Sequence, residues 1–156
     1  MTTSDLADVT MRRAAPADIP RMVELIAGAN LPPLFISEYL DGFAVGEQGG
    51  QVVGCGGIEM YGSSAVIRSI VVGERMRGTG LGRKLSELLM SDAKAAGATD
   101  LYLFTADAHD FWQHLGFVDI ALGDWKAEAR VNWQYQFISQ NADLIGGEIY
   151  TMWRKA

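Results

Sequence analysis

The sequence predicts a mixed α/β domain built around one central sheet. The chain has 156 residues, of which 49% are hydrophobic and 21% charged, proportions typical of a single folded domain. Strand-like and helix-like segments alternate along it, and a glycine-rich turn stands between a strand and a helix. We therefore expect one domain over residues 1–156, with the order β-α-α-β-β-β-α-β-α and a less regular C-terminal β segment.

The first half of the chain predicts three strands and two helices. Pro16 is typical of a helix start, and apolar residues then recur at helical spacing from Ile19 until Gly28. Pro32 and Pro33 interrupt the pattern because neither can donate a backbone hydrogen bond. The expected elements are strand 10–13, helices 19–27 and 34–40, and strands 43–47 and 51–61.

The second half predicts two further strands and two helices. Leucines recur on one side of the first of these helices, and Gly97 is a typical helix stop. The expected elements are strand 65–72, helix 81–96, strand 101–105 and helix 109–115. Residues 118–156 hold six of the fifteen aromatic residues, which we expect to complete the sheet and its core, or to line a pocket or a dimer contact.

Composition excludes several classes of function. The net charge of −6 argues against a general nucleic-acid or acidic-membrane partner. One cysteine and two histidines exclude an intrachain disulfide and a cysteine-rich metal site. The sequence shows neither an apolar run of membrane-span length nor the basic-then-apolar order of a secretory signal. We therefore expect a cytoplasmic protein that uses no metal.

The most informative segment is the turn Arg77-Gly78-Thr79-Gly80-Leu81-Gly82-Arg83, which opens helix 81–96. Glycines let a ligand approach the main chain closely, and the first turn of a helix offers unpaired N–H groups with partial positive charge. Two arginines add formal charge, so the turn predicts a pyrophosphate site. It lacks the Gly-Lys-Ser/Thr ending of a Walker loop and the GxGxxG spacing of a Rossmann turn.

Two motifs together resemble the GCN5-related N-acetyltransferase (GNAT) family. Strand residues Ile70-Val71-Val72 followed by this turn are similar to the family's acetyl-CoA signature, Gln/Arg-x-x-Gly-x-Gly/Ala. Downstream, Ala108-x-x-Phe111-Trp112-x-x-x-Gly116-Phe117 is similar to its second signature. The resemblance covers residues 10 to 118 and implies an acetyl-CoA-dependent N-acetyltransferase.

The resemblance also implies roles in cofactor binding. The main chain of Ile70–Val72 would pair with pantetheine, and the amides of the turn would hold the pyrophosphate. A backbone N–H near Val72 would polarise the thioester carbonyl and so act as a catalytic oxyanion donor. The implied cofactor-binding residues are Ile70, Val71, Val72, Arg77, Gly78, Thr79, Gly80, Leu81, Gly82, Arg83, Thr105 and Trp112.

Two of these positions depart from the family pattern. Thr105 stands where the family commonly has an asparagine, and threonine can still donate a hydrogen bond. Trp112 replaces the tyrosine that often protonates the leaving thiolate, and an indole N–H is no acid at neutral pH. The thiolate would take its proton from water or another group, while Trp112 either packs on pantetheine or belongs to the core.

The acceptor amine needs a base, because it is protonated at neutral pH. Glu59, late in the glycine-rich strand, is the leading candidate, with Tyr61 a weaker substitute. The alternatives for Glu59 are a solvated carboxylate or a structural partner of Arg68. Arg68 lies two residues before Ile70 and is therefore expected on the same face. It could bind a substrate carboxylate in bidentate fashion, assisted by Ser69.

These features predict direct acetyl transfer to a small amine, since no activated nucleophile is visible. The residues around Glu59 and Arg68 resemble a small-molecule branch that includes amino-acid and arsenic-resistance-associated acetyltransferases, so an amino acid or amino-acid-like toxin is the expected acceptor. The alternatives are acetylation of a protein N-terminus or lysine, and a non-catalytic acyl-CoA sensor. The resemblance also leaves room for a homodimer.

Overall fold

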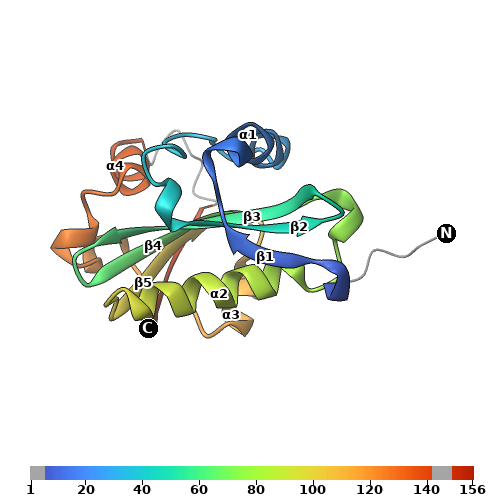
Figure 1. Ribbon diagram of the computed structural model, residues 1–156. Coiled ribbons are helices and arrows are strands. Elements are labelled where there is room, and N and C mark those ends of the chain that lie inside the picture. The colour runs from blue at the N-terminus through green and yellow to red at the C-terminus, as the bar shows by residue number, and fades with distance from the viewer. Residues whose placement is uncertain (1–5, 142–148) are drawn as a thin grey trace. The chain divides into compact units, whose positions relative to one another are not determined.

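The computed structural model describes residues 6–141 and 149–156. Within these ranges seven strands form a mostly antiparallel sheet in the order β1-β2-β3-β4-β5-β7-β6. Figure 1 labels β1 to β5. The strands are β1 (Thr10–Arg13), β2 (Phe43–Gln48), β3 (Gln51–Tyr61), β4 (Ser64–Val72), β5 (Asp100–Thr105), β6 (Val118–Asp119) and β7 (Tyr150–Lys155). The α-helices are α1 (Ile19–Gly28), α2 (Leu81–Ala95), α3 (His109–His114) and α4 (Trp133–Gln140). The predicted mixed α/β class is confirmed.

The contacts of the chain group it into two compact units. The first unit comprises residues 1–58 and 67–92, and the second comprises residues 59–66 and 93–156. The expectation of a single domain stays a prediction.

In the first unit, helices cover both faces of the strands (Figure 1). One face packs against α1, where Met22 and Ile26 are fully buried with the strand residues Val45 and Cys55. The other face packs against α2. A Cβ atom at Gly54 would lie 2.9 Å from Leu81 Cδ2, and one at Gly56 would lie 2.9 Å from Leu89 Cδ1. The glycines of β3 therefore make room for close packing, as their density in the sequence predicts.

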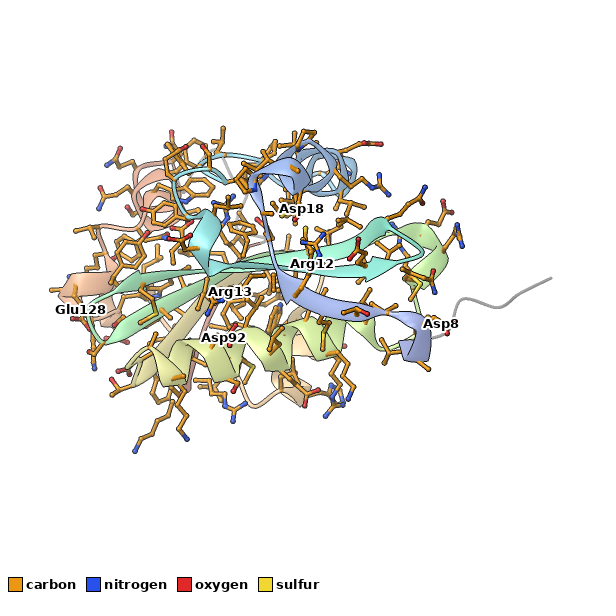
Figure 2. The ribbon with its side chains drawn as sticks, viewed as in Figure 1. Asp8, Arg12, Arg13, Asp18, Asp92 and Glu128 are labelled. Carbon is orange, nitrogen blue, oxygen red and sulfur yellow. The ribbon has the colours of Figure 1, made fainter. Side chains whose placement is uncertain are left out.

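A charged cluster ties β1 to the start of α1. The Arg12 guanidinium donates to both carboxylate oxygens of Asp18, at 2.7 and 3.0 Å, and both residues are labelled in Figure 2. It also donates to Glu47 at 3.1 Å. Asp18 also accepts from the amide of Ala15 at 2.7 Å, just before the 3₁₀ turn Pro16–Asp18. Hydrogen bonding to Arg12 lowers the pKa of Asp18 below its usual value, even though burial of the carboxyl opposes this.

The expected helix over residues 34–40 is wrong. This stretch forms turns, and only Leu40–Gly42 makes a short 3₁₀ helix. Phe35 has a φ of 60°, a left-handed value that a right-handed helix cannot contain.

In the second unit, the C-terminal segment completes the sheet around an aromatic core. β7 runs antiparallel to β5, from Asp100 opposite Lys155 to Thr105 opposite Tyr150, and also pairs with β6. Trp125 stacks on Tyr102 and Phe104, with ring centroids 4.4 and 4.9 Å apart. Thus part of the tail fills the core as predicted, although α4 was not anticipated. Across the described ranges, no helix has the length and apolar character needed to cross a bilayer.

Candidate active site

The glycine-rich turn forms the start of α2 in the first unit. Gly78 and Gly80 have φ values of 78° and 89°, which glycine adopts without strain. A helical hydrogen bond joins the Lys84 amide to the Gly80 carbonyl at 3.0 Å, so the amides before Lys84 lack a helical acceptor. Thr79 Oγ1 accepts from the Leu81 amide at 3.3 Å, and the Leu81 side chain is fully buried. The hydrogen bond to Thr79 and the buried side chain of Leu81 thus hold the turn in place.

The outer side of the turn has room for an anion. A Cβ atom at Gly78 would meet nothing within 4 Å, and one at Gly80 would meet only Leu6 Cδ2, at 3.9 Å. Arg77 and Arg83 are exposed. The end of β4 lies beside the turn, because a Cβ at Gly82 would lie 3.9 Å from Val72 Cγ1. Open backbone, exposed guanidinium groups and a helix start fit a pyrophosphate.

Strand β4 changes direction at Ser69, which has a φ of 59°. Ile70 faces α2, since its Cδ1 atom would lie 2.3 Å from a Cβ at Gly56. The Arg68 guanidinium instead lies 5.3 Å from the ring centroid of Phe43, a residue of the core beneath α1. The expectation that Arg68 and Ile70 share a face is therefore wrong, because the left-handed residue between them breaks the alternation of the strand.

Arg68 is 3% exposed, and its guanidinium donates hydrogen bonds on its own face of the unit. Its Nε donates to Ser69 Oγ at 3.1 Å, and Nη2 reaches the carbonyl oxygen of Pro32 at 3.5 Å. The segment around Pro32 exposes the apolar side chains of Leu31, Leu34 and Phe35 by 40%, 49% and 45%. A planar cation is thus held next to an apolar, partly open loop.

In the second unit, Glu59 is 1% exposed, which excludes a solvated strand-end carboxylate. Its Oε1 accepts from the Tyr61 hydroxyl at 2.6 Å and from Asn132 Nδ2 at 2.9 Å. Its Oε2 accepts from Trp133 Nε1 at 2.9 Å. Burying a carboxylate is costly unless donors surround it, and these three neutral donors offset that cost.

Asn132 and Trp133 were not predicted as site residues from the sequence. Trp133, Tyr135 and Phe137 alternate with polar residues, a pattern that resembles a strand and hides the helix. The available signal was Asn132 itself, because asparagine is a preferred N-cap. Its side chain accepts from the Tyr135 amide at 3.0 Å and caps α4.

Thr105 and Trp112 also lie in the second unit. Thr105 ends β5, and its Oγ1 accepts from the Ala108 amide at 3.1 Å. Trp112 is 6% exposed, and its ring lies edge-on to the ring of Phe117, with the two ring centroids 5.3 Å apart. Trp112 therefore packs in the protein interior, while the implied contacts of both residues with the cofactor stay predictions.

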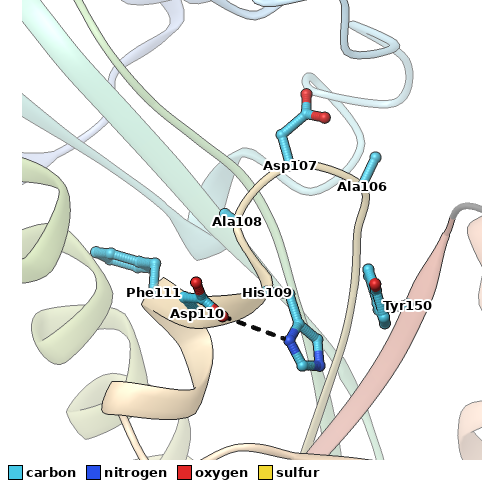
Figure 3. A pocket seen from close by; sticks show the side chains of 7 residues that line it. All are labelled: Ala106, Asp107, Ala108, His109, Asp110, Phe111 and Tyr150. Atoms are coloured by element: carbon cyan, nitrogen blue, oxygen red, sulfur yellow. Dashed lines mark ion pairs between the residues drawn. The ribbon is translucent and has the colours of Figure 1, made fainter.

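A pocket of about 500 Å³ opens where β5 leads into α3 (Figure 3). His109 and Tyr150 form part of its wall, with ring centroids 4.1 Å apart. His109 Nε2 lies 2.7 Å from Asp119 Oδ1, and Nδ1 lies 3.9 Å from Asp110. The pocket thus has an aromatic wall and an acidic rim. Within the described ranges, no group of three or more His, Cys, Asp or Glu could hold a metal ion.

Comparison with known proteins places the chain in a family. The model of the acetyltransferase (GNAT) family matches residues 17–117, well over half of the sequence. The chain belongs to this family. An uncharacterized N-acetyltransferase of Chlorobaculum tepidum is 32% identical over 122 residues, which cover 73% of this chain and 78% of that relative. The protein is accordingly a GNAT N-acetyltransferase with acetyl-CoA as co-substrate.

Solved structures share the fold at low identity. A Mycobacterium tuberculosis protein in complex with CoA superposes with a TM-score of 0.80 at 22% identity, covering 94% of this chain and 99% of that one. The N-acetylglutamate synthase of Neisseria gonorrhoeae, complexed with coenzyme A and N-acetyl-glutamate, gives 0.78 at 17% identity, covering 94% and 35%.

Proposed function

We propose that this GNAT enzyme acetylates the amine of a small molecule that also carries a carboxylate, such as an amino acid or an amino-acid-like toxin. The observation that carries the proposal is the guanidinium of Arg68, buried in β4 beside the apolar loop at Pro32. A guanidinium matches a carboxylate with two parallel hydrogen bonds. The fold neighbour N-acetylglutamate synthase, whose structure contains N-acetyl-glutamate, adds support.

The proposed roles follow the chemistry of acetyl transfer. Glu59 takes a proton from the acceptor ammonium, and the neutral amine attacks the thioester carbonyl carbon. As the N–C bond forms, the Val72 backbone N–H stabilises the oxyanion. The nitrogen then loses its second proton to solvent water as the C–S bond breaks, and the thiolate takes a proton from solvent because the Trp112 indole cannot supply one. This direct transfer needs no acyl-enzyme.

The turn and the adjacent strand would hold acetyl-CoA. The amides and side chains of Arg77–Arg83 would bind the pyrophosphate, and the main chain of Ile70–Val72 would bind pantetheine. Thr105 and Trp112 are the implied contacts from the second unit. Ser69 is proposed to assist Arg68 in binding the acceptor, and Tyr61 is proposed to bind the acceptor as well. A cytoplasmic location and a homodimer stay predictions.

The first test measures CoA release from acetyl-CoA with a panel of amino acids, each paired with the amine that lacks its carboxylate. Amino-acid-like toxins, polyamines and aminoglycosides complete the panel. We expect release with an amino acid or toxin, acetylated product by mass spectrometry, and a clear preference over the decarboxylated partner. CoA binding without release for any amine would contradict the proposal and favour a macromolecular acceptor or a sensor.

Variants of Arg68 then test the carboxylate contact. Arg68→Lys keeps the charge but loses the planar fork, and we expect the KM for the amino acid to rise about 10- to 100-fold. The KM for the decarboxylated amine should change little. Arg21→Ala, on the exposed side of α1, is the matched control. An equal rise for both members of the pair would argue against the contact.

A further inference from the structure

We infer that the pocket at the end of β5 binds an organic cation, either an alkylammonium or a guanidinium group. Residues 106–111 and Tyr150 line this pocket, whose volume is about 500 Å³ (Figure 3). All of these residues belong to the second unit. None of them has a role in the proposed acetyl transfer, so the inference goes beyond the proposed function and is tested without it.

The first observation is an aromatic wall that is held in place and still open to solvent. The rings of His109 and Tyr150 lie with their centroids 4.1 Å apart and their planes at 38°. His109 Nε2 is hydrogen-bonded to Asp119 Oδ1 at 2.7 Å, which orients the imidazole against Tyr150. Tyr150 is nevertheless 45% exposed. An aromatic ring held in this way can bind a cation over its open area through the ring quadrupole.

The second observation is the charge of the lining residues. Asp107 lies at the crest of the loop between β5 and α3, and the Asp110 carboxylate lies 3.9 Å from His109 Nδ1 (Figure 3). Both aspartates are exposed, and the lining contains neither Lys nor Arg. A phosphate or carboxylate ligand would therefore meet like charge, whereas a cation would be attracted.

His109 is the one lining group that can carry a positive charge and so oppose a cation. Two carboxylates face its ring, that of Asp119 at Nε2 and that of Asp110 at Nδ1. The imidazole and these two carboxylates together carry negative charge whether or not the ring is protonated. The attraction for a cation therefore does not depend on the protonation state of His109.

The third observation is the size of the pocket, which favours an organic cation over a metal ion. A volume of about 500 Å³ lies within the range of small-molecule sites. Over residues 6–141 and 149–156, no group of three or more His, Cys, Asp or Glu could hold a metal ion. Ala106, Ala108 and Phe111 add apolar lining for the carbon atoms of a ligand. Charge, aromatic ring and volume together match a guanidinium or an alkylammonium group.

The experiment titrates the whole protein with methylguanidinium at constant ionic strength, without acetyl-CoA or an acceptor. Methylurea is the matched control, because it has the same planar shape without the charge. We expect saturable shifts of the ring resonances of His109 and Tyr150 with methylguanidinium and with propylammonium, and none with methylurea or 1-propanol. Equal shifts with the neutral compounds, or no saturable shift with either cation, would overturn the inference.

Variants of Tyr150 test the aromatic wall, with the His109 resonances as the readout. Tyr150→Leu removes the ring, and we expect the Kd for methylguanidinium to rise about 3- to 30-fold. Tyr150→Phe keeps the ring and should bind the probe as the unchanged protein does. Phe137→Leu is the control, because Phe137 is an exposed aromatic residue elsewhere in the second unit.

The double variant Asp107→Asn with Asp110→Asn tests the acidic rim. Exposed carboxylates attract a cation weakly, so we expect the Kd for methylguanidinium to rise about 2- to 10-fold. Asp124→Asn is the control, because Asp124 is exposed and lies outside the lining. An unchanged Kd in both Tyr150→Leu and the double variant would show that the probe binds elsewhere, and would overturn the inference.

A last arm, with acetyl-CoA present, identifies the source of the cation. If the acetyl acceptor supplies it, an amine that competes with methylguanidinium is recovered as its N-acetyl product, and Tyr150→Leu raises the KM for that amine. If a separate effector supplies it, the competing amine is recovered unchanged. Both results agree with the inference, whereas displacement of methylguanidinium by CoA would assign the pocket to the cofactor and overturn it.

Failure of the inference and failure of the proposed function are distinguishable. The titration with methylguanidinium needs no turnover, so cation binding is measured even if no amine of the panel is acetylated. Conversely, a pocket that binds no cation leaves the acetylation of an amino acid and its dependence on Arg68 unaffected.

Discussion

Arg68 shows how a single backbone angle can decide the chemistry of a face. A regular strand would place its side chain beside that of Ile70, under α2. The φ of 59° at Ser69 turns it to the other face, where Phe43 and the Pro32 carbonyl receive the guanidinium. A serine in this conformation costs of order 1–3 kcal/mol, a cost that the surrounding structure must offset.

Gly80 carries the most direct prediction for the cofactor turn. Gly80→Asp should lower acetyl-CoA affinity by about 100-fold or more, because a carboxylate opposes the pyrophosphate and a side chain is strained at a φ of 89°. Calorimetric titration with acetyl-CoA measures the affinity of the variant. Gly97→Asp is the matched control: it lies past the other end of α2 with a φ of 101° and open space around it. We expect that variant to bind acetyl-CoA normally, and equal losses would contradict the pyrophosphate assignment.

The thiol of Cys55 should be unreactive toward thiol reagents in the folded protein. It is fully buried, and burial raises the pKa of its thiol to about 12. A disulfide exchange reagent near pH 8 should therefore find no reactive thiol in the native chain and one after unfolding in guanidinium, since the sequence has a single cysteine. If the Cys55 thiol reacted with the reagent at the same rate in the native and the unfolded chain, β3 would open far more readily than its packing indicates.

At the scale of elements, the link between β1 and the start of α1 depends on Asp18. Arg12 lowers the pKa of this carboxyl in the folded state, so the ionised group stabilises the fold above the unfolded value, near about pH 4. Asp18→Asn should lower the free energy of unfolding by about 1–2 kcal/mol near pH 7, a value that allows for the partly exposed Arg12.

The difference in the free energy of unfolding between the two proteins should narrow as the pH falls below about 4. Protonation of Asp18 then removes from the protein without the substitution the same stabilisation that Asp18→Asn removes. Urea titrations at several pH values measure it, with the exposed Asp124→Asn as control. A difference that stays constant down to about pH 2 would contradict the ionic origin of the effect.

Helix α4 shows where element prediction from sequence fails. Its hydrophobic residues alternate with period two, so its helical state depends on the Asn132 cap and on the contacts of Tyr135 with Trp125 and the Leu122 carbonyl. By contrast, the other helices and strands up to α3, apart from the stretch 34–40, were predicted to within one residue at each end. Their periodicity agrees with the faces that they bury.

For the whole molecule, binding of acetyl-CoA should stabilise the fold. At about 100 times its Kd, a ligand that binds only the folded state adds about 2.7 kcal/mol. For a chain of 156 residues this corresponds to a rise in Tm of roughly 5–10 °C. A thermal scan with and without acetyl-CoA measures the shift, and Gly80→Asp should abolish it. A full shift in that variant would show that binding does not use the turn.

The fold class, the glycine-rich turn and the acetyltransferase family were predictable from the sequence, because they depend on local periodicity and on residues adjacent in the chain. The face that Arg68 occupies and the donors around Glu59 depend on tertiary contacts. Asn132 lies 73 residues from Glu59 in the sequence, and no local pattern encodes a hydrogen bond over that separation. Such contacts form only when burial forces distant polar groups to satisfy one another.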